Sequence, residues 1–245
     1  MYEPSRTRAP AYDHAVRTAF EGGSPRPQRV RTRTAEPGLG QAPHLAHLAS
    51  VVLRTDTGEI LALDPARWHG PATQEEQDLL AGVDGPVIDL GCGPGRLVVS
   101  LADKRIPALG IDSCPSAIAL ARRRGASVLE RNIFGPLPGE GQWRTALLFD
   151  GNVGIGGDPV RLLGRCRRLI GGQGRVVVEV EPPGTGWRRV KAWFERHGHS
   201  GSSFDWAVVG ADAIADVAEA AALGVADLAP TGSGRWFAHL EAAVP

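Results

Sequence analysis

The 245-residue sequence has little cysteine, methionine or tyrosine and no net charge. Its three cysteines, Cys92, Cys114 and Cys166, lack the paired spacing of a metal site and are too few for a disulfide framework. Basic and acidic residues both number 27, so no overall field draws the chain to nucleic acid or to a membrane. No apolar run is long enough for a membrane span or a signal peptide. We therefore expect a cytoplasmic protein with no bound metal.

Glycine, alanine and arginine are abundant and lysine is scarce, which is typical of high-GC bacterial genes. The length suits one sizeable α/β domain with an appendage. Residues 1–41 are rich in arginine, proline and glycine, but no aromatic residues are interleaved with the arginines around position 30. This composition favours a solvated arm over a phosphate-binding surface.

Apolar runs at 50–53 and 59–63 flank a Thr-Asp-Thr-Gly turn and predict a β-hairpin. Residues 65–71 contain two prolines and a glycine, and we expect a rigid linker there. Thr73 followed by Glu76 predicts a capping box at the start of a helix. We place a domain boundary near residue 81. Residues 1–80 would then form an N-terminal extension or lid, and residues 81–245 the main domain.

The motif that organises the chain is Val-Ile-Asp-Leu-Gly-Cys-Gly-Pro-Gly-Arg at 87–96. It is an apolar strand that turns on glycine into a helix, which is how an α/β fold brings its backbone close to a ligand. A dinucleotide fingerprint requires a third glycine where this chain has Arg96. Asp89, before the turn, repels phosphate but suits an ammonium or sulfonium group.

The acid and the three alternating glycines resemble motif I of the class I S-adenosylmethionine (SAM) dependent methyltransferases. A second strand predicted over 107–111 is followed by Asp112, about 20 residues beyond the loop, where an acid binds ribose hydroxyls. Pro115 then opens a helix that ends at Gly125, as in motif II of that family. The resemblance covers about residues 81–245.

The resemblance implies a Rossmann-like, doubly wound seven-stranded α/β sheet. Its strand order would be 3-2-1-4-5-7-6, with the last strand antiparallel and a cap after strand 5. It also implies SAM as cofactor. The residues that the family pattern places around the cofactor are Asp89, Gly91, Cys92, Gly93, Gly95, Asp112, Ser113, Asn132, Ile133, Asp150 and Gly151. Asn132 replaces the acid that the family often places near adenine, and its amide can still accept a hydrogen bond.

The substrate is expected outside the carboxyl end of the fourth strand, where Asn152 follows Asp150 and Gly151. Residues 182–203 would cover the pocket as a substrate cap. Trp193 and His197, four residues apart, predict a helix over 187–197. Trp187 and Trp193 suit a flat or apolar small molecule, although they could equally pack the cap itself.

Methyl transfer from SAM needs alignment and desolvation, and a weakly acidic acceptor also needs a base. The base candidates are His197, His199 and Glu181, with His69 and Asp205 as further candidates. Each of them could instead have a purely structural role. An amine or a soft carbon acceptor would need no base.

The function that we predict is methyl transfer from SAM to a small molecule, with O-methylation in secondary metabolism favoured. Nucleic-acid motifs are missing after the fourth strand, and we expect a monomer or a homodimer without membrane partners. Three alternatives stay open: an NAD-dependent oxidoreductase, a SAM-binding protein that does not methylate, and a protein or RNA methyltransferase that uses the arginine-rich arm.

Overall fold

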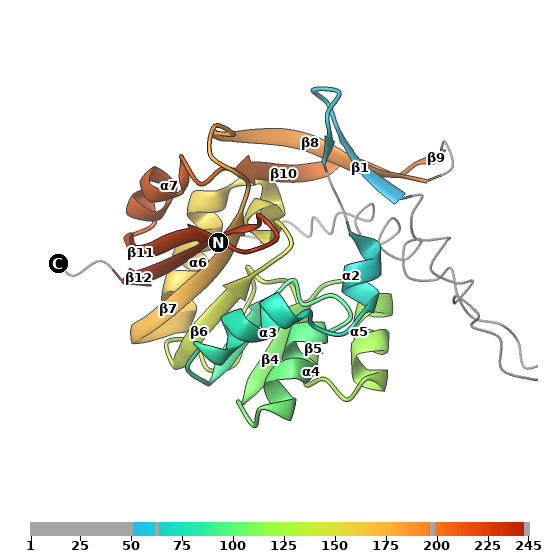
Figure 1. Ribbon diagram of the computed structural model, residues 1–245. Coiled ribbons are helices and arrows are strands. Elements are labelled where there is room, and N and C mark those ends of the chain that lie inside the picture. The colour runs from blue at the N-terminus through green and yellow to red at the C-terminus, as the bar shows by residue number, and fades with distance from the viewer. Residues whose placement is uncertain (1–50, 62–63, 197–198, 243–245) are drawn as a thin grey trace, which may run out of the picture.

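The computed structural model describes residues 51–61, 64–196 and 199–242, and it contains two β-sheets (Figure 1). The main sheet has the order β11-β12-β7-β6-β3-β4-β5, and the second has the order β10-β8-β1-β2, with β9 paired to β8. Strands β3, β4, β5, β6 and β7 run parallel to one another. Strand β12 is antiparallel to both β7 and β11. The predicted order 3-2-1-4-5-7-6 is therefore confirmed. The arginine-rich arm and His197 lie outside the described residues.

Most strands of the main sheet are followed by a helix along the chain. The strands are β3 (Val87–Leu90), β4 (Ala108–Asp112), β5 (Val128–Glu130), β6 (Trp143–Leu148), β7 (Ile170–Val180), β11 (Leu223–Pro230) and β12 (Trp236–Ala242). The helices are α2 (Pro65–His69), α3 (Gln74–Ala81), α4 (Arg96–Asp103), α5 (Pro115–Arg123), the 3-10 helix η2 (Asn152–Gly157), α6 (Pro159–Leu169) and α7 (Ile214–Ala220).

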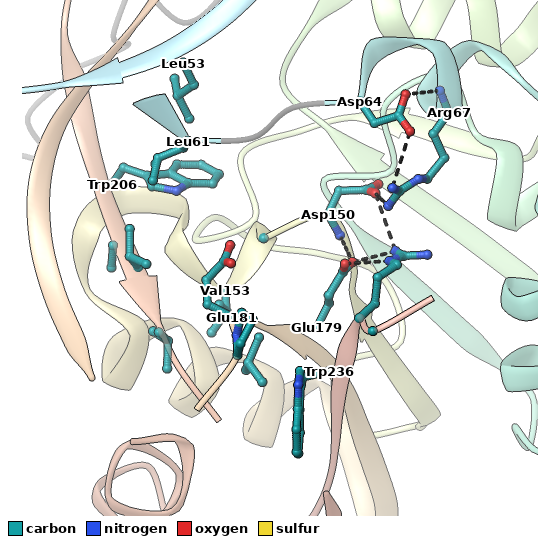
Figure 2. A pocket seen from close by; sticks show the side chains of 18 of the residues that line it. Leu53, Leu61, Asp64, Arg67, Asp150, Val153, Glu179, Glu181, Trp206 and Trp236 are labelled. Atoms are coloured by element: carbon teal, nitrogen blue, oxygen red, sulfur yellow. Dashed lines mark hydrogen bonds and ion pairs between the residues drawn. The ribbon is translucent and has the colours of Figure 1, made fainter. Parts of the chain in front are cut away.

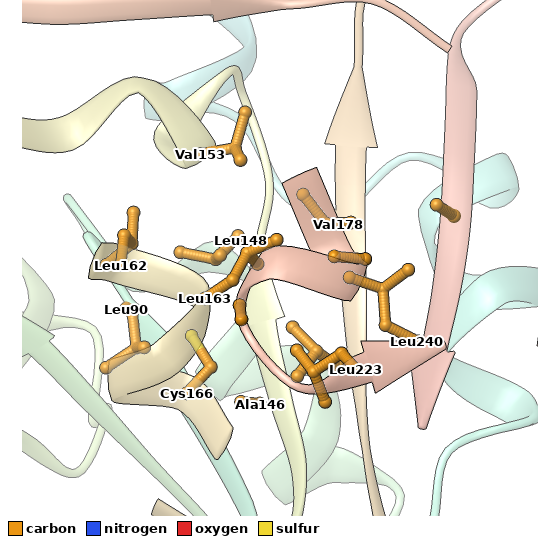
Figure 3. Packing of buried hydrophobic residues seen from close by; sticks show 14 of the residues in the cluster. Leu90, Ala146, Leu148, Val153, Leu162, Leu163, Cys166, Val178, Leu223 and Leu240 are labelled. Atoms are coloured by element: carbon orange, nitrogen blue, oxygen red, sulfur yellow. The ribbon is translucent and has the colours of Figure 1, made fainter. Parts of the chain in front are cut away.

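Helices cover both faces of the main sheet, so its central strands are apolar on both sides. On β7, Val176 and Val178 pack with residues of α6 and α7, while Val177 packs with residues of α3 and α4. Figure 3 shows the first of these cores, with Leu163 and Cys166 of α6 against the sheet. This double burial is why the strands read as continuous apolar runs.

The second sheet adjoins the edge of the main sheet where its parallel strands end. It contains β1 (Val51–Thr55), β2 (Ile60–Leu61), β8 (Trp187–Arg196), β9 (His199–Ser200) and β10 (Phe204–Val209). The Glu181 backbone N–H, just after β7, donates to the carbonyl of Val209 at 2.8 Å. Leu53 on β1 pairs with Phe194 on β8, and the Phe194 and Phe204 rings lie 5.5 Å apart. An apolar cluster thus faces the main domain.

Two expectations for local structure are wrong. Residues 187–196 form a strand rather than a helix, because Val190, Ala192 and Phe194 alternate into the apolar interior. The expected linker at 65–71 contains helix α2, which Asp64 caps by accepting from the backbone N–H of Arg67. The hairpin at β1–β2 is confirmed.

The capping box of α3 is also confirmed, since Thr73 and Glu76 exchange side-chain-to-backbone hydrogen bonds. Strand β1 precedes position 81 and pairs with β8, which follows it, so the second sheet uses both sides of the expected domain boundary. That boundary stays a prediction. Within the described parts of the chain, no helix is both long and apolar enough to cross a membrane.

Buried Arg165 on α6 fixes the loop that follows β5. Its Nε donates to the carbonyl of Ile133 at 2.9 Å, and its Nη2 donates to the carbonyl of Gly135 at 2.6 Å and to Glu140 Oε1 at 2.7 Å. A buried carbonyl that loses its donor carries the full cost of its desolvation.

We expect Arg165→Ala to lower the free energy of unfolding by about 3 kcal/mol, because charge-assisted hydrogen bonds to buried carbonyls are lost. Urea denaturation followed by tryptophan fluorescence measures the change. Arg168→Ala, at an exposed position on the same helix, is the control and should change stability by less than about 0.5 kcal/mol. Equal losses in the two variants would contradict this account of the loop.

Candidate functional site

The glycine-rich loop between β3 and α4 exposes its backbone to an adjacent cavity. Gly91 and Gly93 have positive φ angles of 80° and 52°, which favour glycine. A Cβ atom on Gly91 would lie 2.6 Å from the Asn152 amide nitrogen, so the close approach of η2 also requires glycine there. A Cβ on Gly93 would meet no atom within 4 Å among the described residues. The space above Gly93 can therefore receive a ligand.

Two polar side chains hold this loop in place. Asp112, at the end of β4, accepts from the backbone N–H of Gly93 at 2.9 Å and from that of Cys114 at 2.8 Å. The Asn152 amide donates to the carbonyls of Leu90 at 3.1 Å and Gly91 at 3.0 Å. The loop is thus tied to the ends of β4 and β6, its two neighbours in the sheet.

The cavity over the loop, called here the glycine-loop cavity, has a volume of about 70 Å³. One wall comes from the main domain and the other from the second sheet and α2. It is lined by Leu53, Trp68, Gly91, Cys92, Gly93, Pro94, Arg96, Asp112, Asp150, Asn152, Phe194, Phe204 and Trp206. Its lining combines loop backbone, the carboxylates of Asp112 and Asp150 and the guanidinium of Arg96 with apolar and aromatic side chains, an arrangement that suits a polar cofactor with a flat ring.

Asp89 lies beneath the loop and is 2% exposed. Its Oδ2 atom has no hydrogen-bond partner within the parts of the chain that the structure describes. Burial raises the pKa of Asp89 to about 7; the charge of Arg96 opposes the rise, and Asp150, Asp112 and Glu76 add to it. A cation nearby would stabilise the ionised form of such an acid.

A buried network of charges surrounds Arg96, the first residue of α4. Arg96 Nη2 lies 2.7 Å from Glu76 Oε1, and its Nη1 lies 2.8 Å from Asp150 Oδ2. Burial alone would raise the pKa of Glu76, but hydrogen bonds and charge from Arg96, with the Thr73 backbone N–H, hold it at about 2. The network thus keeps Glu76 ionised in the interior.

Arg235, in the turn between β11 and β12, extends the same network to β7. It forms a two-pronged pair with Glu179, with Nε–Oε1 and Nη2–Oε2 distances of 2.7 Å, and its Nη1 donates to Glu76 at 3.0 Å. Glu179 in turn accepts from the backbone N–H of Asp150 at 2.6 Å. The charges therefore connect α3, α4, β7 and the residues that follow β6.

A second cavity of about 300 Å³ lies beside the first, between the two sheets, and is called here the inter-sheet cavity (Figure 2). Four residues line both cavities: Leu53, Trp68, Asp150 and Trp206. The inter-sheet cavity also meets Glu181, whose carboxylate points into it in Figure 2, and the aromatic ring of Trp236. The two spaces thus share a wall at the end of β6.

The structure brings several of the predicted residues together and leaves others apart. Gly91, Cys92, Gly93, Asp112, Asp150 and Asn152 line the glycine-loop cavity, and Asp150, Gly151 and Glu181 line the inter-sheet cavity. Neither cavity is lined by Asp89, Gly95, Ser113, Asn132, Ile133, Trp187, Trp193 or His199. Trp187 is 48% exposed, and the Asn132 side chain accepts from the Phe134 backbone N–H at 2.9 Å.

Three residues of the site were not identified from the sequence: the aromatic side chains Trp206 and Trp236 and the network partner Arg235. Phe204 and Trp206 lie two residues apart on β10, on the same face of the strand, and this spacing is visible in the sequence. Trp236 and Arg235 reach the site only because β12 inserts beside β7, which no local pattern reveals. Asp205, named as a base candidate, pairs with Lys191 at 2.8 Å on the exposed side of β10, and His69 lies at the end of α2 outside both cavities.

No group of three or more His, Cys, Asp or Glu side chains that could hold a metal ion occurs within the described residues. The chain matches no family model, and no curated protein matches it in sequence.

Solved structures show that the chain has the fold of class I SAM-dependent methyltransferases. A SAM-dependent methyltransferase from Bacteroides fragilis in complex with S-adenosylhomocysteine has a TM-score of 0.65 and 16% identity, over 79% of this chain and 88% of the other. The sugar N-methyltransferase KedS8 from Streptoalloteichus has a TM-score of 0.55 and 15% identity, over 89% and 100%. The 1,6-didemethyltoxoflavin N1-methyltransferase from Burkholderia thailandensis has a TM-score of 0.53 and 18% identity, over 72% and 81%.

We compare the free energy of unfolding of Asp89→Asn with that of the wild type. We expect this difference to shift in favour of the variant by about 2–3 kcal/mol between pH 5 and pH 8. The folded-state pKa of Asp89 is raised to about 7 from 3.8, so folded Asp89 holds a proton that the unfolded chain has lost between these values. Wild-type stability therefore falls as pH rises through this window, and the amide variant has no such loss.

Urea unfolding of both proteins at the two pH values measures the difference. Any fixed cost of the buried amide cancels in this comparison. A stability difference that does not change with pH would show that Asp89 is already ionised at pH 5.

Proposed function

We propose that this protein transfers a methyl group from SAM to a small-molecule acceptor. The observation that carries the proposal is the pair of adjoining cavities, which share Asp150 and Trp206 at the carboxyl edge of a methyltransferase-type sheet. The glycine-loop cavity would hold part of the cofactor, since its volume of about 70 Å³ is below that of a whole SAM molecule, and the inter-sheet cavity would hold the acceptor. The shared wall marks where the methyl group would pass.

The residues over the glycine loop fit SAM in their chemistry. Gly93 leaves its backbone open, and the Asp112 carboxylate lies in the wall where the family resemblance places a ribose partner. A carboxylate has about four acceptor sites, so the backbone bonds of Asp112 are compatible with ribose hydroxyls. Buried Asp89, whose pKa is raised to about 7, lies below the loop, and a cationic ligand there would favour its ionised form. When bound, SAM supplies a methyl group on a cationic sulfur.

Glu181 is the base candidate that the geometry favours. It lines the inter-sheet cavity, whereas His199 lies on the exposed strand β9 away from both cavities. Burial and the neighbouring charge of Glu179 raise the pKa of Glu181, and Arg188 opposes the rise. A carboxylate with a raised pKa is better suited to accept a proton from an acceptor.

The atom that accepts the methyl group could be oxygen or nitrogen. The sequence favours a hydroxyl and a place in secondary metabolism, and both stay predictions. Two of the similar solved structures are instead N-methyltransferases, one acting on a sugar and one on 1,6-didemethyltoxoflavin. An inter-sheet cavity of about 300 Å³ favours a small molecule over a polymer for either chemistry.

We expect Asp112→Ala to weaken SAM binding by about 1–3 kcal/mol, on the scale of a lost charged hydrogen bond. Titration calorimetry with SAM measures the affinity, and circular dichroism checks that the fold is retained. Asp112→Asn retains a single acceptor oxygen, so it can keep the bond from the Gly93 N–H or the bond from the Cys114 N–H but not both.

Asp216→Ala, exposed on α7, is the matched control and should bind SAM as the wild type does. Unchanged SAM affinity in Asp112→Ala would contradict the cofactor assignment. Binding of NADH in place of SAM, followed by its fluorescence, would support the oxidoreductase alternative instead.

A further inference from the structure

The inter-sheet cavity combines apolar walls with charged groups at one side. The apolar lining includes Leu53, Leu61, Val153, Val209, Trp206 and Trp236. Figure 2 shows the carboxylate of Glu181 directed toward the side on which Trp206 and Leu61 lie. An occupant would therefore bury an apolar body and present one polar group to Glu181.

The other charged side chains that line this cavity are already neutralised by partners. Arg67 lies 3.3 Å from Asp64, and the two are joined through their side chains. Asp150 pairs with Arg96 at 2.8 Å, and Glu179 pairs with Arg235 at 2.7 Å. These pairs leave little charge available to a ligand.

Glu181 differs from these residues. Its carboxylate makes no hydrogen bond and no ion pair with any described residue, and Arg188, the nearest compensating charge, is engaged by both oxygens of Glu59. Its position is nonetheless fixed, because its backbone N–H donates to Val209 and its carbonyl accepts from Ala211, both at 2.8 Å. The cavity thus presents one unpaired negative charge, on an exposed side chain whose backbone is fixed.

We infer, building on the proposed function, that the acceptor is a small apolar molecule with a basic amine, and that Glu181 binds this amine as an ammonium group. A neutral hydroxyl would make no ion pair with Glu181, whereas an ammonium group would form one. The indole of Trp206 lines the same cavity as Glu181 and offers a further favourable surface for a cation.

The methyl transfer is then balanced in atoms and electrons. The ammonium group gives one proton to the Glu181 carboxylate, and the free amine nitrogen uses its lone pair to form a bond to the methyl carbon. The carbon–sulfur bond of SAM breaks, its electron pair stays on sulfur, and S-adenosylhomocysteine and a methylated ammonium result. Glu181 finally releases its proton to water.

The test compares amines with alcohols of the same skeleton on protein loaded with S-adenosylhomocysteine. The probes are tryptamine with tryptophol and 2-phenylethylamine with 2-phenylethanol, measured by titration calorimetry. We expect each amine to bind at least about ten-fold more tightly than its alcohol, which corresponds to one favourable charge interaction. Glu181→Gln should abolish this preference while S-adenosylhomocysteine still binds.

Glu219→Gln, an exposed acid on α7, is the control and should keep the preference. The inference is overturned if the alcohols bind as well as the amines, if no amine binds, or if the preference survives in Glu181→Gln. Failure of the wild-type protein to bind S-adenosylhomocysteine would instead count against the proposed function. The two failures are therefore distinguishable.

Discussion

The pairing of Arg96 with Glu76 and Asp150 is the interaction on which the site depends. These three side chains come from α4, α3 and the residues after β6, and Arg235 joins them to β7 through Glu179. Removing one member of a buried ion pair costs about 3–5 kcal/mol, because the partner is left charged and unpaired. The network therefore stabilises one arrangement of the elements that meet at the carboxyl edge of the sheet.

This network also determines where the glycine loop lies. Arg96 follows the loop directly, so fixing its guanidinium fixes the start of α4, while Asp112 and Asn152 fix the loop backbone from two sides. The loop is thus held before any ligand arrives, and binding need not order it. Asp89, beneath it, is a buried acid to which a cation nearby would add a favourable interaction.

The sequence predicted those parts of the fold that depend on local chemistry. The apolar runs of β3 and β4, the acid Asp112 after β4 and the capping box of α3 were all visible in short windows. The segment of β8 was misjudged because Trp193 and His197 have helical spacing, whereas the alternation of Val190, Ala192 and Phe194 prevails once β1 and β10 pair on either side. Long-range pairings such as that of Arg235 with Glu76 have no local signal.

Both cavities take part of their wall from the main sheet and part from the second sheet. The glycine-loop cavity rests on the main sheet, whose strand ends are fixed by buried packing and by the charge network. Part of the wall of the inter-sheet cavity comes from β1, β2 and β10, and the pairing of β1 with β8 joins segments that lie far apart in the sequence. Changes in the second sheet can therefore reshape the space beside Glu181 while Arg96 and the glycine loop keep their positions. A change on one side would reach the other through the residues that line both cavities, which are Leu53, Trp68, Asp150 and Trp206.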